Sequence, residues 1–442
     1  MTDTLFPLPE SEPKAAAPEA PGAPRLVVPN RAQIELRAVD LESLLPMDHP
    51  ARAVWDFVEA LDLSSLYAEV AAVEGRAGRP ATDPRIYLAL WLFATVEGVG
   101  SARALERLTE QHDAYRWICG GVSVNYHSLA DFRVHHLEFL DRLLTESVAV
   151  LMAQGVVQLH RVAQDGMRVR AAAGAASFRR QSTLERCLEQ AQEQVETLRR
   201  ELEHKSEATS RRQAAARQRA AEQRQRRVAQ ALAQMPEAAA KKPAGQKDQA
   251  RVSTTDAEAR VMKMADGGFR PAYNGQFSAD TATQIIVGVD LSNSGSDQGK
   301  LVPMTEQLQE RYGKVPSESL VDGGFAGLHD IAGATELGTK IYAPVVKPRD
   351  PQRDPYQPLP TDPPAIAEWR RRMGTADAKQ VYKLRAATAE CVNALARNRG
   401  LQRLRVRGLR KARAVLLWFA IAHNLMRSLS LRAARQVALP AT

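Results

Sequence analysis

Two aspartates far apart in the chain, Asp165 and Asp322, stand where a carboxylate could do metal chemistry. Asp165 lies inside Val162-Ala-Gln-Asp-Gly-Met-Arg-Val-Arg170, which the apolar positions predict to be a strand. Aspartate is depleted in strands and costly to bury unpaired, so an acid there is often held to bind a cation. The alternative is an ordinary aspartate at a strand end or turn. Asp322 ends a second predicted strand, directly before Gly-Gly-Phe325.

A third acid is predicted on a helix that packs against the sheet. Glu390 and Arg397 are seven residues apart, so they lie within about 20° of each other around a helix and share a face. Carboxylates suit a hard divalent cation such as Mg²⁺. Two such ions flanking a phosphodiester can activate a hydroxyl nucleophile and stabilise the leaving oxygen. Asp290 is the rival for the second acid, and Glu368 is the rival for the third.

The order of these residues resembles the bacterial insertion-sequence transposases of the DDE type. In that family a Tyr, an Arg, the catalytic Glu and a later Lys or Arg recur along one helix. The matching residues here are Tyr382, Arg385, Glu390 and Arg397. The first family Asp precedes a Gly, as in Gln164-Asp-Gly166, and the second precedes a Gly/aromatic turn, as in Val321-Asp-Gly-Gly-Phe325.

The segment before these acids resembles the N-terminal domain of the same family. The residues that carry this likeness are Gly78-Arg-Pro80, Asp83-Pro-Arg85 and Tyr115-Arg-Trp-Ile-Cys-Gly-Gly121. The resemblance covers residues from about 40 to 430. It implies an RNase H-like α/β core of mixed strand direction and an all-α N-terminal domain.

The resemblance also implies a mechanism and partners. Asp165, Asp322 and Glu390 would bind two Mg²⁺, with Mn²⁺ as a substitute, and would cut the element ends with water. The freed 3′-hydroxyl would then attack target DNA without a covalent protein intermediate. The implied partners are terminal inverted repeats, target DNA and a second copy of the chain, without a membrane or a small-molecule substrate.

The chain departs from the family pattern in three places. The spacing from Arg385 to Glu390 is one residue longer than usual, which in a regular helix would turn Arg385 about 140° away from Glu390. The last cation is Arg397 rather than Lys, and the coiled-coil insertion is long.

Patterning along the chain predicts four parts. They are a disordered tail (1–30), an all-α DNA-binding domain (31–155), a catalytic domain (156–178 and 251–432) and a coiled-coil insertion with its linker (179–250). In the helical domain the candidates for DNA contact are Arg76, Arg79, Arg103 and Arg133. Each of them could equally be ordinary surface charge.

The insertion has a heptad seam. Leu184, Leu188, Ala191, Val195, Leu198 and Leu202 alternate spacings of four and three, and Ala214, Ala221, Val228 and Met235 are seven apart. We predict an antiparallel helical hairpin whose arginine-rich face is a DNA clamp, a dimerisation arm or merely a solvated surface.

Composition agrees with a nucleic-acid partner. The 442 residues carry a net charge of +9 and a sequence pI near 9.5, which favours a polyanionic partner. The three cysteines lie far apart, as in a reduced cytosolic protein. The longest apolar run, Ala412 to Leu425, is too short to span a membrane. We expect a cytoplasmic, nucleoid-associated bacterial protein.

Two other functions fit parts of the sequence. A catalytically inactive transposase-derived repressor would keep the basic helical domain and lose the metal chemistry. A structural coiled-coil protein would use the insertion but leave the α/β half unexplained.

Overall fold

The structure is a computed structural model that describes residues 40–73, 75, 80–203, 208–348 and 350–438. The predicted disordered tail lies outside these residues, as do Arg76 and Arg79. From Leu41 onward the chain forms one unit.

In the described residues, a bundle of seven α-helices forms the N-terminal part of this unit, as the apolar periodicity predicts. The helices are α1 (Pro50–Glu59), α2 (Ser64–Ala68), α3 (Pro84–Val96), α4 (Ala102–Gln111), α5 (Asp113–Cys119), α6 (Tyr126–His135) and α7 (Leu137–Ala153). Helix α3 is apolar nearly all round and is buried accordingly. It begins as predicted, because Asp83 accepts the backbone N–H of Arg85 at 2.8 Å and Pro84 occupies the first turn.

A mixed sheet follows the bundle. Its strands are β1 (Arg161–Arg170), β4 (Arg260–Lys263), β5 (Phe269–Asp280), β6 (Ile286–Ser292), β7 (Glu318–Leu320) and β8 (Lys340–Tyr342). The order is β6-β5-β1-β7-β8, with β4 beside the other end of β5. The first three of these strands run antiparallel and the last three parallel. This mixed α/β arrangement is that of an RNase H-like core.

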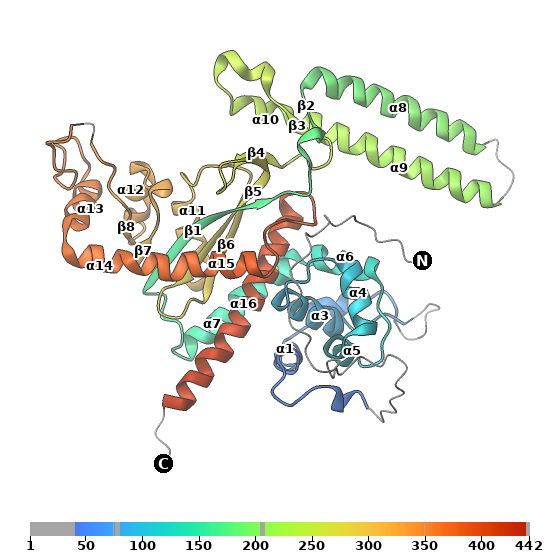
Figure 1. The fold of residues 1–442 in the computed structure, drawn as a ribbon, viewed down its shortest axis with the longest axis horizontal. Coiled ribbons are helices and arrows are strands. Elements are labelled where there is room, and N and C mark those ends of the chain that lie inside the picture. Colours follow the sequence, from blue (N-terminus) through green and yellow to red (C-terminus); the bar gives the residue numbers. More distant parts are fainter. Residues whose placement is uncertain (1–39, 74, 76–79, 204–207, 349, 439–442) are drawn as a thin grey trace, which may run out of the picture. The chain divides into compact units, whose positions relative to one another are not determined.

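Helices cover both faces of the sheet (Figure 1). One face carries α11 (Leu301–Tyr312), whose Met304 sulfur would lie 2.5 Å from a Cβ added to Gly288. The other face carries α16 (Leu409–Ala438), whose Leu416 would lie 2.7 Å from a Cβ added to Gly275. The missing side chains of these two strand glycines let the helices approach closely.

Helix α16 also packs against the N-terminal bundle through α3, α6 and α7, and thereby joins bundle to sheet. By length and hydropathy its residues Leu409–Arg435 could cross a membrane, which the shorter apolar run in the sequence did not predict. Because 67% of its most apolar window is buried within the protein, α16 is accounted for as a core helix.

The remaining helices follow the last strands. They are α12 (Leu328–Glu336), α13 (Pro364–Gly374), α14 (Ala376–Arg385), a π-helical turn (Ala386–Glu390) and α15 (Cys391–Asn398). The long helix predicted from residue 375 to 398 is therefore present, with one irregular turn in its middle.

The predicted hairpin is formed by α8 (Gln181–Glu203) and α9 (Ala208–Ala233), followed by α10 (Met235–Ala240). The short strands β2 (Phe178–Arg179) and β3 (Val252–Ser253) pair at its base (Figure 1). The seam residues Leu184, Ala191, Val195, Ala214, Ala221 and Val228 are buried. The hairpin thus buries its heptad seam within one chain.

Candidate active site

The sheet brings Asp165 and Asp322 together. Strands β1 and β7 are parallel neighbours in which Ala163 pairs with Leu320, and each aspartate follows its paired residue by two positions. Asp322 caps the turn Gly323–Phe325, where it accepts the backbone N–H of Gly324 at 2.8 Å. The two aspartates therefore lie side by side where the short strand β7 ends, next to the middle of the longer strand β1.

Asp165 is held by two hydrogen bonds and one ion pair, and its side chain is 18% exposed. Its Oδ2 accepts a hydrogen bond from the Asn393 amide at 3.0 Å and lies 3.7 Å from the Arg385 guanidinium, while its Oδ1 accepts the Gly166 N–H at 2.9 Å. Burial raises the pKa of Asp165 to about 6, and the negative charge of Asp322 adds to the rise, whereas Arg385 opposes it.

A fourth acid, Asp297, lies directly behind Asp165 on the other face of the sheet. It is 6% exposed and accepts hydrogen bonds from Asn274 at 2.7 Å, Gln276 at 2.8 Å and Arg168 at 3.1 Å. A Cβ on Gly166 would lie 2.2 Å from its Oδ1, so only glycine fits after Asp165. The Asp-Gly pair was visible in the sequence, but Asp297 was missed because it is a loop residue without a local motif.

The π-helical turn brings Arg385 and Glu390 together. The Arg385 guanidinium donates to Glu390 at 2.9 Å and lies 3.7 Å from Asp165. The expectation that Arg385 points about 140° away from Glu390 holds only for a regular helix and is wrong here. The extra residue in the spacing is absorbed by the wider turn, a feature often found at functional sites.

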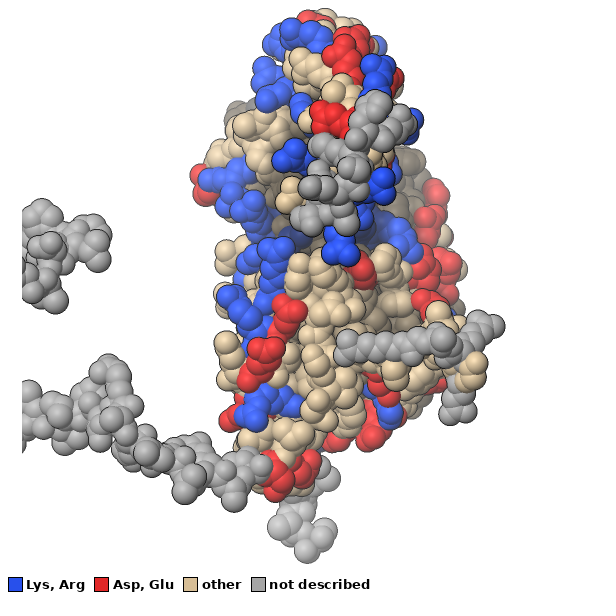
Figure 2. All heavy atoms as spheres, turned by 90° about the vertical axis from the view of Figure 1, so that its right-hand side faces the viewer, with Lys and Arg blue, Asp and Glu red and all other residues tan. Residues whose placement is uncertain are grey.

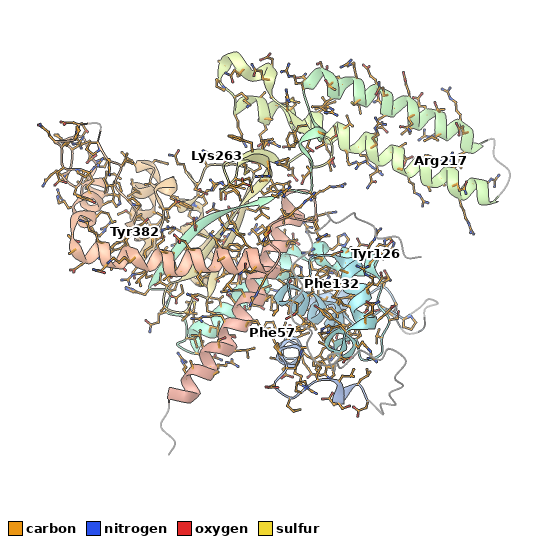
Figure 3. All side chains as sticks on the ribbon, viewed as in Figure 1. Phe57, Tyr126, Phe132, Arg217, Lys263 and Tyr382 are labelled. Carbon is orange, nitrogen blue, oxygen red and sulfur yellow. The ribbon has the colours of Figure 1, made fainter. Side chains whose placement is uncertain are left out.

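Tyr382 completes this side of the site on α14 (Figure 3). The Arg385 guanidinium carbon lies 5.9 Å from the centre of the Tyr382 ring. Burial raises the pKa of Tyr382, Arg385 opposes the rise, and the charges of Asp322 and Asp165 add to it. Tyr382 and Arg385 thus form one wall of the site.

Two of the three predicted metal ligands are placed to bind a hard divalent cation together. Burial is the main cause of the raised pKa of Asp165, the charge of Asp322 adds to it, and a bound cation would relieve both effects. Glu390 is 59% exposed and is tied to Arg385. Within the described ranges no group of three or more His, Cys, Asp or Glu side chains is gathered closely enough to hold a metal ion. The pair Asp165–Asp322 therefore fits the ion, while Glu390 is joined to it through Arg385.

The rival acids lie elsewhere. Asp290 pairs with Gln276 in the sheet, which places it on the face opposite Asp165. Glu368 is bound to Arg372 on the same helix at 2.9 Å.

The predicted DNA-contacting arginines have different surroundings. Arg103 is exposed and stacks on Tyr126 at 4.8 Å. Arg133 stacks on Trp91 at 4.5 Å and donates to the Gly100 carbonyl at 2.7 Å. Arg397 is exposed at the end of α15. Figure 3 shows Tyr126 on α6, in the helical bundle.

Comparison with known families gives two matches. Residues 39–135, most of the helical bundle, match a family described as a transposase domain (DUF772). Residues 363–429, which include Tyr382, Arg385, Glu390 and Arg397, match a family described as a transposase DDE domain. The second match does not extend to Asp165 or Asp322. No curated protein and no solved structure matches the chain.

Proposed function

Because this chain belongs to the transposases and carries a DDE domain, we propose that it cuts both ends of its own element and joins them to target DNA. Enzymes of this family cleave DNA, transfer strands and generally use a divalent metal. The reaction proposed here is hydrolysis at the element ends, followed by attack of the freed 3′-hydroxyl on target DNA.

The observation that carries this proposal is the link between the acids. Asp165 in the middle of β1 lies beside Asp322, which follows the end of the parallel strand β7, and Arg385 connects Asp165 to Glu390. These three acids would hold Mg²⁺, or Mn²⁺ in its place. When bound, such cations activate the attacking oxygen and stabilise the leaving oxygen.

The chain's own groups would position the DNA and the acids. The Asn393 amide orients the Asp165 carboxylate through a 3.0 Å hydrogen bond. Arg385 neutralises Asp165 and Glu390 in the resting protein, and it would turn to a DNA phosphate when the strand enters. Arg397, seven residues after Glu390 and near the end of α15, would hold a second phosphate.

The proposal also assigns a role to each part of the chain. The helical domain (31–155), with Arg76, Arg79, Arg103 and Arg133, would recognise the inverted repeats. The catalytic domain comprises 156–178 and 251–432, and the insertion (179–250) would brace DNA. A homodimer would hold the two ends, and the protein would act in the cytoplasm on the bacterial nucleoid.

The test is cleavage of a plasmid that carries the element with its flanking DNA. Wild-type protein should nick it only with Mg²⁺ or Mn²⁺, and Asp165→Asn, Asp322→Asn and Glu390→Gln should each lose at least about a hundredfold in rate, as removal of one transition-state contact does. Asp290→Asn and Glu368→Gln are the matched controls and should cut normally. DNA binding without cleavage by wild-type protein would instead support a transposase-derived repressor.

A further inference from the structure

Two hollows adjoin each other beside the catalytic strand. The first, about 690 Å³, lies between the loop after α3 and the segment that links α15 to α16. The second, about 700 Å³, lies beside β1 and β4 and reaches Gly166, which follows Asp165 in the chain and borders Asp297. Both are lined by Arg397, Leu401 and Gln402, so they are continuous.

Positive charge dominates both hollows. The first is lined by six arginines and one acid, Glu97; the arginines are Arg133, Arg397, Arg399, Arg403, Arg405 and Arg407. The second adds Arg168, Arg170, Lys263 and Arg270, and its one acid, Asp266, is already paired with Arg270. The two hollows together are therefore lined by ten basic and two acidic residues, which makes their surface strongly positive.

Several of these charges have no partner in the described parts of the chain. Arg397, Arg403, Arg405 and Arg407 are exposed and form no ion pair there. The Arg133 Nε and the Arg399 Nη1 are buried without a hydrogen-bond acceptor. A buried donor left unsatisfied is costly, and a ligand that supplies oxygen acceptors would remove that cost.

Two of the cations also repel each other. A Cβ on Gly100 would lie 3.7 Å from Arg405 and 3.9 Å from Arg133, so both guanidinium groups border this glycine. Burial lowers the pKa of Arg133, the charge of Arg405 adds to the fall, and together they bring it to about 10. An anion between the two would stabilise both.

The floor of the first hollow is fixed to the catalytic strand. The Arg170 N–H donates to the Gln402 carbonyl at 3.0 Å, and the Leu404 N–H donates to the Arg170 carbonyl at 2.8 Å. The linking segment thus continues the pairing of β1, the strand that carries Asp165. A ligand bound along this segment is therefore held at a fixed position relative to the proposed active site.

We propose that the two hollows form one track for the sugar–phosphate backbone of a DNA strand, leading from the helical bundle along β1 as far as Gly166, the residue after Asp165. This inference rests on the proposed function, because it assigns the path by which the substrate reaches that site. The arginine fork suits phosphate oxygens. Phe419 of α16 is the one aromatic residue lining the described track, and it is buried, so the track would bind backbone rather than stack bases.

The experiment measures binding of the full-length chain to a short labelled duplex of arbitrary sequence and to a polythymidine strand. Fluorescence anisotropy is followed across salt concentrations, with EDTA present so that nothing is cut. The track variant is Arg403→Gln with Arg405→Gln; both side chains are exposed, so folding should be unaffected. The matched control, Arg371→Gln with Arg435→Gln, removes the same charge from exposed positions outside the track.

The track variant should bind the duplex roughly tenfold more weakly at about 0.1 M salt, and its plot of log affinity against log salt should be shallower by about 2. The control should keep the wild-type slope. Equal losses in both variants, or an unchanged slope in the track variant, overturn the inference. If only polythymidine binding falls, the track carries a single strand.

Cleavage separates this inference from the proposed function. If wild-type protein cuts plasmid DNA with Mg²⁺ and the track variant binds and cuts equally well, the function stands and the track does not. If wild-type protein never cuts but the track variant alone loses affinity, the track stands as a DNA-binding site and the nuclease does not.

Discussion

The ionised carboxyl of Asp165 destabilises the folded protein, so the free energy of unfolding should depend on pH. Its pKa rises from an ordinary value near 4 to about 6, because the carboxyl is buried beside Asp322. A carboxyl with a higher pKa in the folded state binds its proton more tightly there, so the folded protein loses stability as pH rises from about 4 to about 6. The loss is about 3 kcal/mol at neutral pH.

The variant Asp165→Asn removes this cost. We expect its free energy of unfolding, measured by urea denaturation without metal, to exceed that of the wild type by about 3 kcal/mol above pH 6 and to approach it near pH 4. Adding Mg²⁺ should stabilise the wild type at pH 7 more than at pH 5, and the variant at neither. Parallel pH curves for the two proteins would contradict the pKa assigned to Asp165.

At the scale of elements, two loops meet at a pair of glycines. Gly98 after α3 and Gly400 after α15 both have positive φ, +73° and +83°. A Cβ on Gly400 would lie 2.9 Å from the Gly98 carbonyl oxygen. This contact holds the helical bundle against the segment that floors the basic track.

The variant Gly400→Ala tests that contact. We expect it to lose about 1–3 kcal/mol of stability, because alanine is strained at this φ and its Cβ meets backbone. Gly245→Ala is the matched control, since a Cβ at Gly245 meets nothing within 4 Å and its φ is not positive; it should change stability by less than about 0.5 kcal/mol. Equal midpoints of thermal unfolding in the two variants would argue against a constrained contact.

The elements also show what the sequence could predict and what it could not. Periodicity was sufficient for the buried helix α3, the strand of Asp165 and the heptad hairpin, because each is a local pattern. The π-helical turn was not predictable, since the spacing of Arg385 and Glu390 fits a regular helix equally well. Asp297 was not predictable because Gly166 and Asn274, which explain it, are distant in sequence.

At the scale of the whole molecule, the hairpin separates its charges between its two helices. Helix α9 holds seven arginines and one glutamate, whereas α8 holds three arginines and six glutamates. Figure 2 shows Lys and Arg gathered at the hairpin end of one face and beneath it. The arginines of the predicted cationic face therefore all lie on α9.

This difference in charge between α8 and α9 favours DNA binding over dimerisation as the role of the hairpin. Its apolar seam is already buried between α8 and α9, so a second chain would have to bind the polar outer faces. An acidic α8 repels DNA, while α9, with Arg217 exposed on it (Figure 3), attracts DNA. We therefore expect α9 to contact the DNA backbone beyond the basic track.

Replacing arginines on one helix at a time tests whether α9 binds the DNA backbone. Changing Arg212, Arg217 and Arg219 of α9 to Gln should make the plot of log DNA affinity against log salt shallower by about 3. Changing Arg186, Arg199 and Arg200 of α8 to Gln removes the same charge and should leave the slope unchanged, because those arginines stand among glutamates. If both sets lowered affinity equally, only net charge would matter. If neither did but the α9 set shifted the sedimentation coefficient toward a monomer, α9 would be a dimerisation arm.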